Sequence, residues 1–264
     1  MPDIKLLRGN PWPDVNWGET AKPAIIVDGA LYSLKDLEDR FIEGDSAYIV
    51  GSNEKNIGHI CSRINPRLIQ FYEMRVSDLS VTQSFTRLTH LAIRWNTKVA
   101  DLGPLERHKN LEVLIIEDTP KIASIAPLAN LQSLRYLDYS GGIWNKNRAE
   151  TLAPISKLRQ LEYLALNNIR VDDGSLKPIV QCQKIKELHI CNKFKTEEFA
   201  YLAANMPNVE CNMFQAYIKL GQSIGGDDVM VVGSRKPFLS SAKDGERLKK
   251  YEANFSKLVK KFSE

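Results

Sequence analysis

Apolar residues recur along the chain in a regular pattern. The motif L-x-x-L-x-L, with other apolar residues at some positions, starts at Leu88, Leu111, Leu134, Leu161, Ile185 and, in degenerate form, Val209. Successive starts lie 23, 23, 27, 24 and 24 residues apart. Self-similarity at a period of about 20 to 50 residues is typical of repeat proteins, so we expect this segment to form a stack of similar coils.

A second apolar column precedes each motif. Its members lie nine, six and three residues before a motif start, and they are Leu102 and Leu105; Ile125, Leu128 and Leu131; Leu152, Ile155 and Leu158; and Leu176, Ile179 and Cys182. Alternation within the motif suits a strand, whereas a spacing of three suits a short helix or a 3-10 segment. The two columns therefore predict an α/β solenoid with a parallel sheet on its concave side and short helices or 3-10 segments on its convex side.

Two stretches of the chain resemble a known family. VADLGPLERHKNLEVLII (99–116) and IASIAPLANLQSLRYLDY (122–139) are similar to the short-repeat class of bacterial leucine-rich-repeat proteins typified by internalins. The resemblance covers about residues 68–214 and implies a leucine-rich-repeat solenoid. Members of this family share a scaffold that binds proteins, and they do not share one particular reaction. The chain departs from the pattern at the ninth repeat position. Asparagine occurs there as Asn96, but the later coils have Thr119, Gly142, Ile169 and Lys193, so we expect less regular turns and a bulge at 141–150.

The flanking segments predict caps at both ends of the solenoid. We divide the chain into an N-terminal arm and capping subdomain (1–67), the solenoid (68–215) and a C-terminal cap (216–264). In the N-terminal part we expect an extended arm over 1–20, a hairpin turning at Asp28-Gly29, helices over 33–41 and 56–64, and a strand over 46–52. In the C-terminal part we expect a strand over 229–232 and a basic amphipathic helix over 247–262.

The open face of the predicted sheet supplies the candidate binding residues. Outward side chains at the third, fifth and seventh strand positions form three parallel columns, and we place Gln70, Tyr72 and Met74 at these positions in the first coil. An apolar and aromatic centre within a polar rim is typical of protein interfaces. The predicted partner-binding residues are Tyr72, Arg94, Val113, Ile115, Glu117, Tyr136, Asp138, Tyr163, Asn167, Glu187 and His189. The alternative is that these tyrosines and valines are ordinary strand residues of high β-propensity.

Other residue types suggest chemistry that their positions do not favour. Cys182, His189, Cys191 and Cys211 are of zinc-ligand type, but Cys182 falls in an inward column and the spacing of the set is not that of a zinc site. His108 occupies the inward slot of Leu131, and His90 has no predicted nucleophile or carboxylate beside it. We therefore predict no catalytic, cofactor-binding or metal-binding residue and no enzymatic activity.

Composition narrows the class of protein. The 264 residues carry 36 lysines and arginines against 32 aspartates and glutamates, and this net charge of +4 is too small to indicate nucleic-acid binding. The sequence contains no run of eighteen apolar residues, so we predict no transmembrane segment. The four cysteines form no C-x-x-C pair, which favours a reducing, cytoplasmic location.

The leading hypothesis is a monomeric, cytoplasmic bacterial scaffold without cofactors that binds another protein on its concave face and neutralises or regulates it. One alternative is an enzyme or nucleotide-binding protein with its site in residues 21–67 or 216–264. The other is a structural protein that self-associates through its terminal helix or an uncapped edge. The C-terminal helix itself can either pack its apolar stripe on the fold or bind a membrane surface or a partner.

Overall fold

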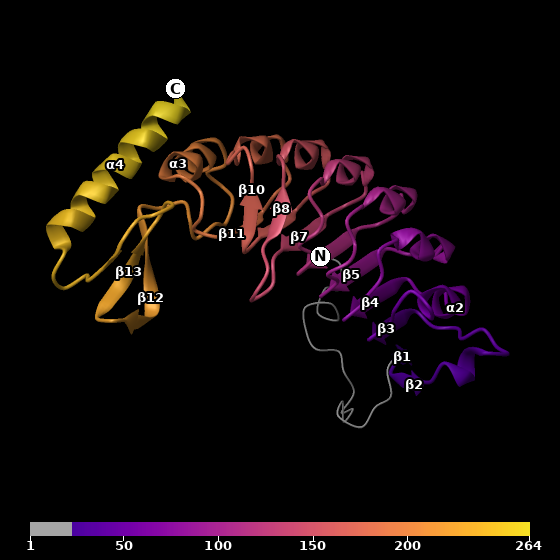
Figure 1. Cartoon of the computed structure of the whole chain (residues 1–264). Coiled ribbons are helices and arrows are strands. Elements are labelled where there is room, and N and C mark those ends of the chain that lie inside the picture. Colours follow the sequence, from indigo (N-terminus) through magenta and orange to yellow (C-terminus); the bar gives the residue numbers. More distant parts are fainter. Residues whose placement is uncertain (1–22) are drawn as a thin grey trace.

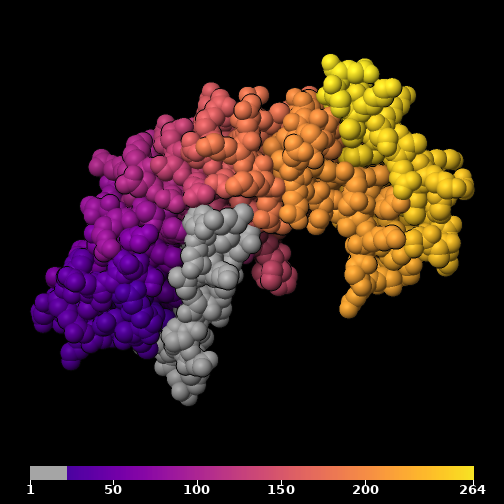
Figure 2. All heavy atoms as spheres, turned by 180° about the vertical axis from the view of Figure 1, so that it is seen from behind, coloured from indigo at the N-terminus to yellow at the C-terminus, as the bar shows by residue number. Residues whose placement is uncertain are grey.

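The computed structural model describes residues 23–264. The predicted arm over 1–20 lies outside the described residues. The chain forms an arch in which the strands line the inner side and short helical segments line the outer side (Figure 1). Figure 2 shows the same arch from behind, with the C-terminal hairpin and helix at one end.

A nine-stranded sheet follows the inner side of the arch. Its order is β11-β9-β7-β6-β5-β4-β3-β1-β2, and the pairs from β3 to β11 are parallel. The repeat strands are β4 (Leu68–Tyr72), β5 (His90–Arg94), β6 (Val113–Glu117), β7 (Tyr136–Ser140), β9 (Tyr163–Leu166) and β11 (Glu187–Ile190). Each predicted motif from Leu88 to Ile185 leads into one of these strands.

The outer side of the coils consists of 3-10 segments, as the spacing of three predicts. They are η2 (Leu79–Ser84), η3 (Gly103–Arg107), η4 (Ala126–Asn130), η5 (Ala153–Lys157) and η6 (Lys177–Gln181). In η3 to η6 a proline occupies one of the first two positions. Proline suits this place because its fixed φ is already helical and its missing N–H has no partner at a helix start. The last coil closes instead with the longer helix α3 (Thr196–Asn205).

The core is one apolar column that runs from end to end of the arch. Leu114, Leu137 and Leu164 are equivalent residues on successive strands, and each is fully buried. The same core reaches from Ile25 in the first strand to Phe255 in the last helix. Burial of one leucine side chain stabilises a fold by about 1.5 to 3 kcal/mol, so the stability of the arch is spread over all its coils.

Buried asparagines connect successive coils. The Asn96 amide donates to the carbonyl of Val76 in the preceding coil, and its oxygen accepts the backbone N–H groups of Lys98 and Val99. In a later coil the inserted segment supplies Asn147, which donates to the Ile116 carbonyl and accepts the Thr119 N–H. The insertion thus replaces a bridge that the repeat pattern lacks at that point.

The insertion also adds a small second sheet. The strands β8 (Asn147–Ala149) and β10 (Ile169–Val171) pair in parallel beside the main sheet. Between β7 and β8 the loop carries Ile143 and Trp144, which are 89% and 88% exposed. The predicted bulge over 141–150 is therefore confirmed, although its second half is ordered as a strand.

The N-terminal cap extends the main sheet. The strands β1 (Ala24–Val27) and β2 (Ala30–Tyr32) form the hairpin predicted at Asp28-Gly29, and β3 (Ser46–Val50) joins β1 to β4. The helix α2 (Ile57–Ser62) is also as predicted. The helix expected over 33–41 is wrong, because only η1 (Lys35–Leu37) forms. Arg40 Nε donates to the Asp36 carbonyl, the acceptor that a further α-helical turn would have used.

The C-terminal cap consists of a three-stranded antiparallel sheet and one long helix. Its strands are β12 (Tyr217–Ile224), β13 (Asp227–Val231) and β14 (Phe238–Leu239), and its helix is α4 (Gly245–Ser263). The helix predicted over 247–262 lies within α4, and the strand predicted over 229–232 overlaps β13, which ends one residue earlier at Val231. The apolar stripe of α4 packs on the fold, where the Tyr201 and Phe262 rings meet edge to face at 5.5 Å.

We expect the substitution Leu164→Ala to lower the free energy of unfolding by about 2 to 5 kcal/mol, because it opens a cavity in the middle of the core column. Urea denaturation followed by circular dichroism measures the change. The exposed substitution Lys109→Ala is the control and is expected to cost less than about 0.5 kcal/mol. Equal effects of the two substitutions would contradict a continuous core at Leu164.

We expect His108 to make stability depend on pH. Burial lowers the pKa of His108, whose Nε2 lies 3.1 Å from the Thr82 hydroxyl. The unfolded chain binds this proton more readily, so stability falls as the pH drops below about 6.5 towards the lowered pKa. His108→Leu, which matches the equivalent Leu131, removes this contribution. Urea midpoints at pH 7.5 and 5 should therefore differ less for the variant than for wild type, and an unchanged difference would refute the assignment.

Candidate protein-binding surface

The predicted outward columns are present on the concave side from β5 to β11. Val113, Tyr136, Tyr163 and Glu187 are consecutive cross-strand partners at the third position. Ile115, Asp138, Ala165 and His189 are consecutive partners at the fifth position, and Arg94 pairs with Glu117 at the seventh. The register predicted for these coils is therefore confirmed.

The register predicted for the first coil is wrong by two residues. Tyr72 pairs with Arg94, so it occupies the seventh position rather than the fifth, and Gln70 occupies the fifth. Met74 corresponds to Asn96 and is fully buried rather than outward-facing. The apolar pattern predicts the wrong register because it takes Leu68 as the first inward residue of this coil. The first inward residue is Pro66, and Leu68 points outward. A two-residue shift leaves Tyr72 on the same face but changes its neighbours.

The last coil departs further from the pattern. Glu210, and not Cys211, forms a bridge with Glu187, and no repeat strand follows it. The ladder of outward side chains therefore ends at β11. Beyond it the chain turns away towards the C-terminal cap.

An aromatic ladder forms the centre of the concave side. The Tyr136 and Tyr163 rings stack with centroids 4.1 Å apart and planes 4° from parallel. The centroid of the His189 ring lies 5.2 Å from that of the Tyr163 ring. These tyrosines belong to a cluster with Ala92, Val113, Ile115 and Ala165 that is separate from the core of the arch. The sheet thus has an apolar cluster on each side, and the predicted aromatic centre exists as a rigid stack.

The expectation that this centre is exposed is wrong. Val113, Ile115, Tyr136 and Tyr163 are only 0%, 1%, 3% and 6% exposed. Neighbouring side chains of the ladder lie about 4.8 Å apart and pack against one another's faces. Alternation along a strand predicts which side of the sheet a residue faces, but not how much of it water reaches.

The rim of the face is polar and internally paired. Arg94 forms an ion pair with Glu117, and the Ser140 hydroxyl donates to Asp138 while it accepts the backbone N–H of Asn167 at 3.1 Å. On β11, His189 Nε2 lies 2.6 Å from a Glu187 carboxylate oxygen. The side chains of His189 and Glu187 are 42% and 28% exposed, and Asn167 is exposed. Apart from Glu117, whose side chain is 37% exposed, the most accessible predicted residues are Asn167 and His189 at the C-terminal end of the face.

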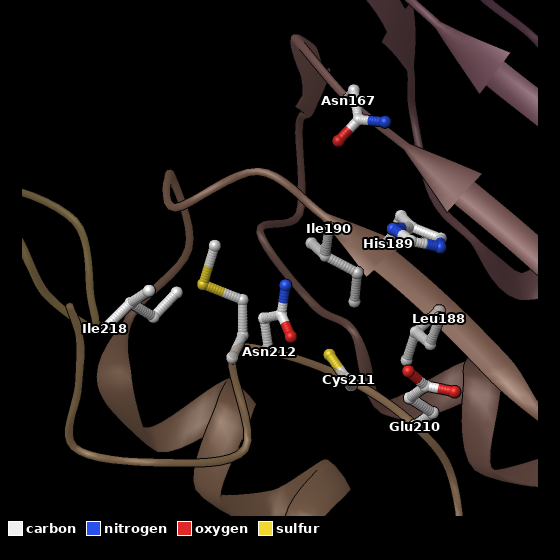
Figure 3. A pocket seen from close by; sticks show the side chains of 9 residues that line it. Asn167, Leu188, His189, Ile190, Glu210, Cys211, Asn212 and Ile218 are labelled. Carbon is white, nitrogen blue, oxygen red and sulfur yellow. The ribbon is translucent and has the colours of Figure 1, made fainter. Parts of the chain in front are cut away.

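A pocket of about 220 Å³ adjoins this accessible end. Figure 3 shows Asn167 and His189 on one side of it and Ile218 on the other, with Cys211 and Asn212 between them. Leu188, Ile190, Glu210 and Met213 complete the lining. The pocket thus lies between β11 and the segment that leads into β12, and it combines apolar walls with the polar groups of the rim.

The cysteines are free thiols in different surroundings. Cys182 is fully buried, as its inward column predicts, and its thiol donates to the Ile155 carbonyl at 3.1 Å. Burial raises the pKa of Cys182 to about 11 and that of Cys61 to about 12. Within residues 23–264, no group of three or more His, Cys, Asp or Glu side chains is arranged to hold a metal ion.

Sequence reasoning missed a second pocket, of about 410 Å³, on the edge of the arch beside β10. It draws residues from the insertion, from β10 and from the start of α3, which are far apart in the repeat pattern. The only sequence signal was the 27-residue spacing that marks the insertion.

Comparison with known proteins identifies the fold. No protein-family model and no curated protein matches the sequence. Among solved structures, internalin C2 of Listeria monocytogenes is similar with a TM-score of 0.50 and 19% identity, over 69% of this chain and 74% of the internalin chain. A leucine-rich-repeat protein of Leptospira interrogans matches with a TM-score of 0.43 and 15% identity, over 67% of this chain and 49% of that chain. The predicted internalin-like leucine-rich-repeat solenoid is confirmed, and at this identity the likeness shows the fold alone.

No helix within residues 23–264 is long and apolar enough to cross a membrane.

We expect Cys191, at the accessible end of the concave face, to react with a thiol reagent such as DTNB at pH 8 at least a hundredfold faster than Cys61 and Cys182. The thiolate is the reactive form, and burial disfavours it at the two inner sites. Mass spectrometry of the partially labelled protein identifies the modified residue. Cys191→Ser should remove the fast phase, and early labelling of Cys182 would contradict the described packing.

Proposed function

We propose that this chain is a binding module for another protein and that the partner docks on the accessible C-terminal end of the concave face. The observation that carries the proposal is the ladder Tyr136, Tyr163 and His189, which leads from a rigid aromatic stack to an open polar rim beside a pocket. The leucine-rich-repeat fold adds support, because such solenoids commonly bind proteins on their concave surface.

Binding on this surface would depend on shape and polarity and would need no bond chemistry. Asn167 and the His189–Glu187 pair offer hydrogen-bonding groups, and Met213 and Ile218 offer apolar walls for a side chain of the partner. The exposed His189 ring packs on the buried Tyr163 ring and is already ordered, so little conformational entropy is lost when a partner contacts it. An apolar anchor in a pocket surrounded by polar groups is the usual arrangement of an interface hot spot.

Three further features belong to the proposal. The free thiols support a reducing, cytoplasmic location. The proposal also includes a monomeric state and a non-catalytic role, in which binding neutralises or regulates the partner.

The double substitution Asn167→Arg/His189→Arg tests the docking surface, because two long cationic side chains would obstruct the rim and the pocket. A partner is first captured from extracts of cells that naturally produce the protein, identified by mass spectrometry and purified. Its affinity for each variant is then measured by calorimetry. We expect the substitution to weaken binding at least tenfold, which corresponds to about 1.4 kcal/mol.

The matched control is Gln181→Arg/Gln183→Arg, which adds the same charge to exposed positions on the outer side of the arch. It should leave the affinity within twofold of wild type. If the outer variant loses binding and the concave variant keeps it, the proposed surface is wrong.

A further inference from the structure

The pocket beside β10 is distinct from the concave face. It lies along β10 and is bounded by Lys193–Lys195 of the next coil, by Lys146 of the insertion and by Ser234 of the C-terminal cap. In the small second sheet β10 pairs only with β8 among residues 23–264, so its other side is a strand edge. The next coil contributes no strand to this sheet, and the pocket occupies the place beside that edge.

The floor of the pocket is apolar. Ile169, Val171 and Phe194 line it and are 2%, 8% and 5% exposed. Ile169 and Val171 are two residues apart on one strand, so their side chains lie on the same face of β10. All three side chains also belong to the core of the arch, so the floor offers a small apolar contact to the side chains of an extended chain, which also recur at every second residue.

The rim of the pocket is basic. Lys146, Arg170, Lys193 and Lys195 line it together with two carboxylates, Asp173 and Glu198. Both carboxylates are already engaged by the fold, since Asp173 accepts the Ser175 N–H at 3.0 Å and Glu198 accepts the Leu176 N–H at 2.7 Å.

The rim cations are only partly compensated. Arg170 pairs with Asp172 outside the pocket, whereas no ion pair within the described part of the chain involves Lys146, Lys193 or Lys195. The lining therefore presents a surplus of positive charge to any occupant.

The walls of the pocket are held in place by hydrogen bonds. The Asn168 side chain donates to the carbonyls of Gly142 and Asn145 in the insertion, and its oxygen accepts the Lys193 ammonium at 2.6 Å. Gly141 passes so close to this residue that an added Cβ would lie 2.3 Å from the Asn168 carbonyl oxygen. The loop that carries Lys146 is thus fixed against β10, and a ligand would meet a preformed groove.

We propose that this groove binds an extended acidic segment of another protein, which adds a strand to the free edge of β10. Aliphatic side chains of the segment rest on Ile169, Val171 and Phe194, and its carboxylates face the lysines of the rim. Strand addition of this kind derives affinity from main-chain hydrogen bonds and specificity from the alternating side chains. The site is separate from the concave face, so this proposal does not depend on the docking surface proposed above.

Selection from a displayed library of random seven-residue peptides tests the proposal on the full-length protein. We expect the recovered peptides to be enriched in Asp and Glu that alternate with Val, Ile or Leu. Fluorescence anisotropy of a labelled, recovered peptide should show binding that weakens at least tenfold between 50 and 300 mM salt, because its main charge contacts are exposed. Recovery of no peptide, or of peptides without acidic enrichment, would overturn the proposal.

Two further measurements locate the site and the binding mode. Lys146→Glu/Lys195→Glu should weaken binding of the recovered peptide at least tenfold, whereas Lys257→Glu/Lys260→Glu, which makes the same charge change on exposed positions of α4, should change it less than twofold. Equal melting temperatures of the two variants exclude a folding defect. N-methylation of alternate peptide amides should abolish binding in one of the two registers. Equal losses in the two lysine variants, or no effect of methylation in either register, would refute strand addition at β10.

Discussion

No coil of this protein can bury its own apolar side chains, and the structure follows from that constraint. Leu137 is shielded from water by Leu114 on one side and Leu164 on the other, and the same holds for each inward position along the arch. Hydrogen bonding between the strands sets the separation of neighbouring coils to about 4.8 Å. Because the inward residues must stay in line, the outward residues are also in line, and this alignment produces the stack of Tyr136, Tyr163 and His189.

Those positions that the core fixes are the ones that the sequence predicts well. The inward columns, the partners of Val113 and Ile115, and the buried places of Cys182 and His108 all follow from the repeat, because a misplaced residue there would expose leucines or bury charges. The register predicted for the first coil is wrong because Pro66 and Met74 occupy inward positions at which the motif has other residue types. The burial of the tyrosines and the pocket beside β10 could not be predicted, because both depend on the packing of side chains from several coils, which spacing along the chain does not encode.

The insertion has a structural role as well as a place in the proposed groove. Asn147 satisfies the backbone groups of Ile116 and Thr119 inside the stack, while Lys146, its neighbour in sequence, lines the groove. A buried backbone group without a partner costs about 1 to 3 kcal/mol, so this loop cannot be shortened freely. Stability and surface chemistry are therefore coupled in one short segment.

The uninterrupted core has a consequence for how the molecule would hold its ligands. Since one apolar column runs from Ile25 to Phe255, the concave pocket and the groove beside β10 are built on the same stiff body. A bound molecule long enough to reach both would meet the second site at a high local concentration once it had engaged the first. Two weak interactions with such a stiff body can together give high affinity, which depends on the length of the segment that connects the two parts of the ligand.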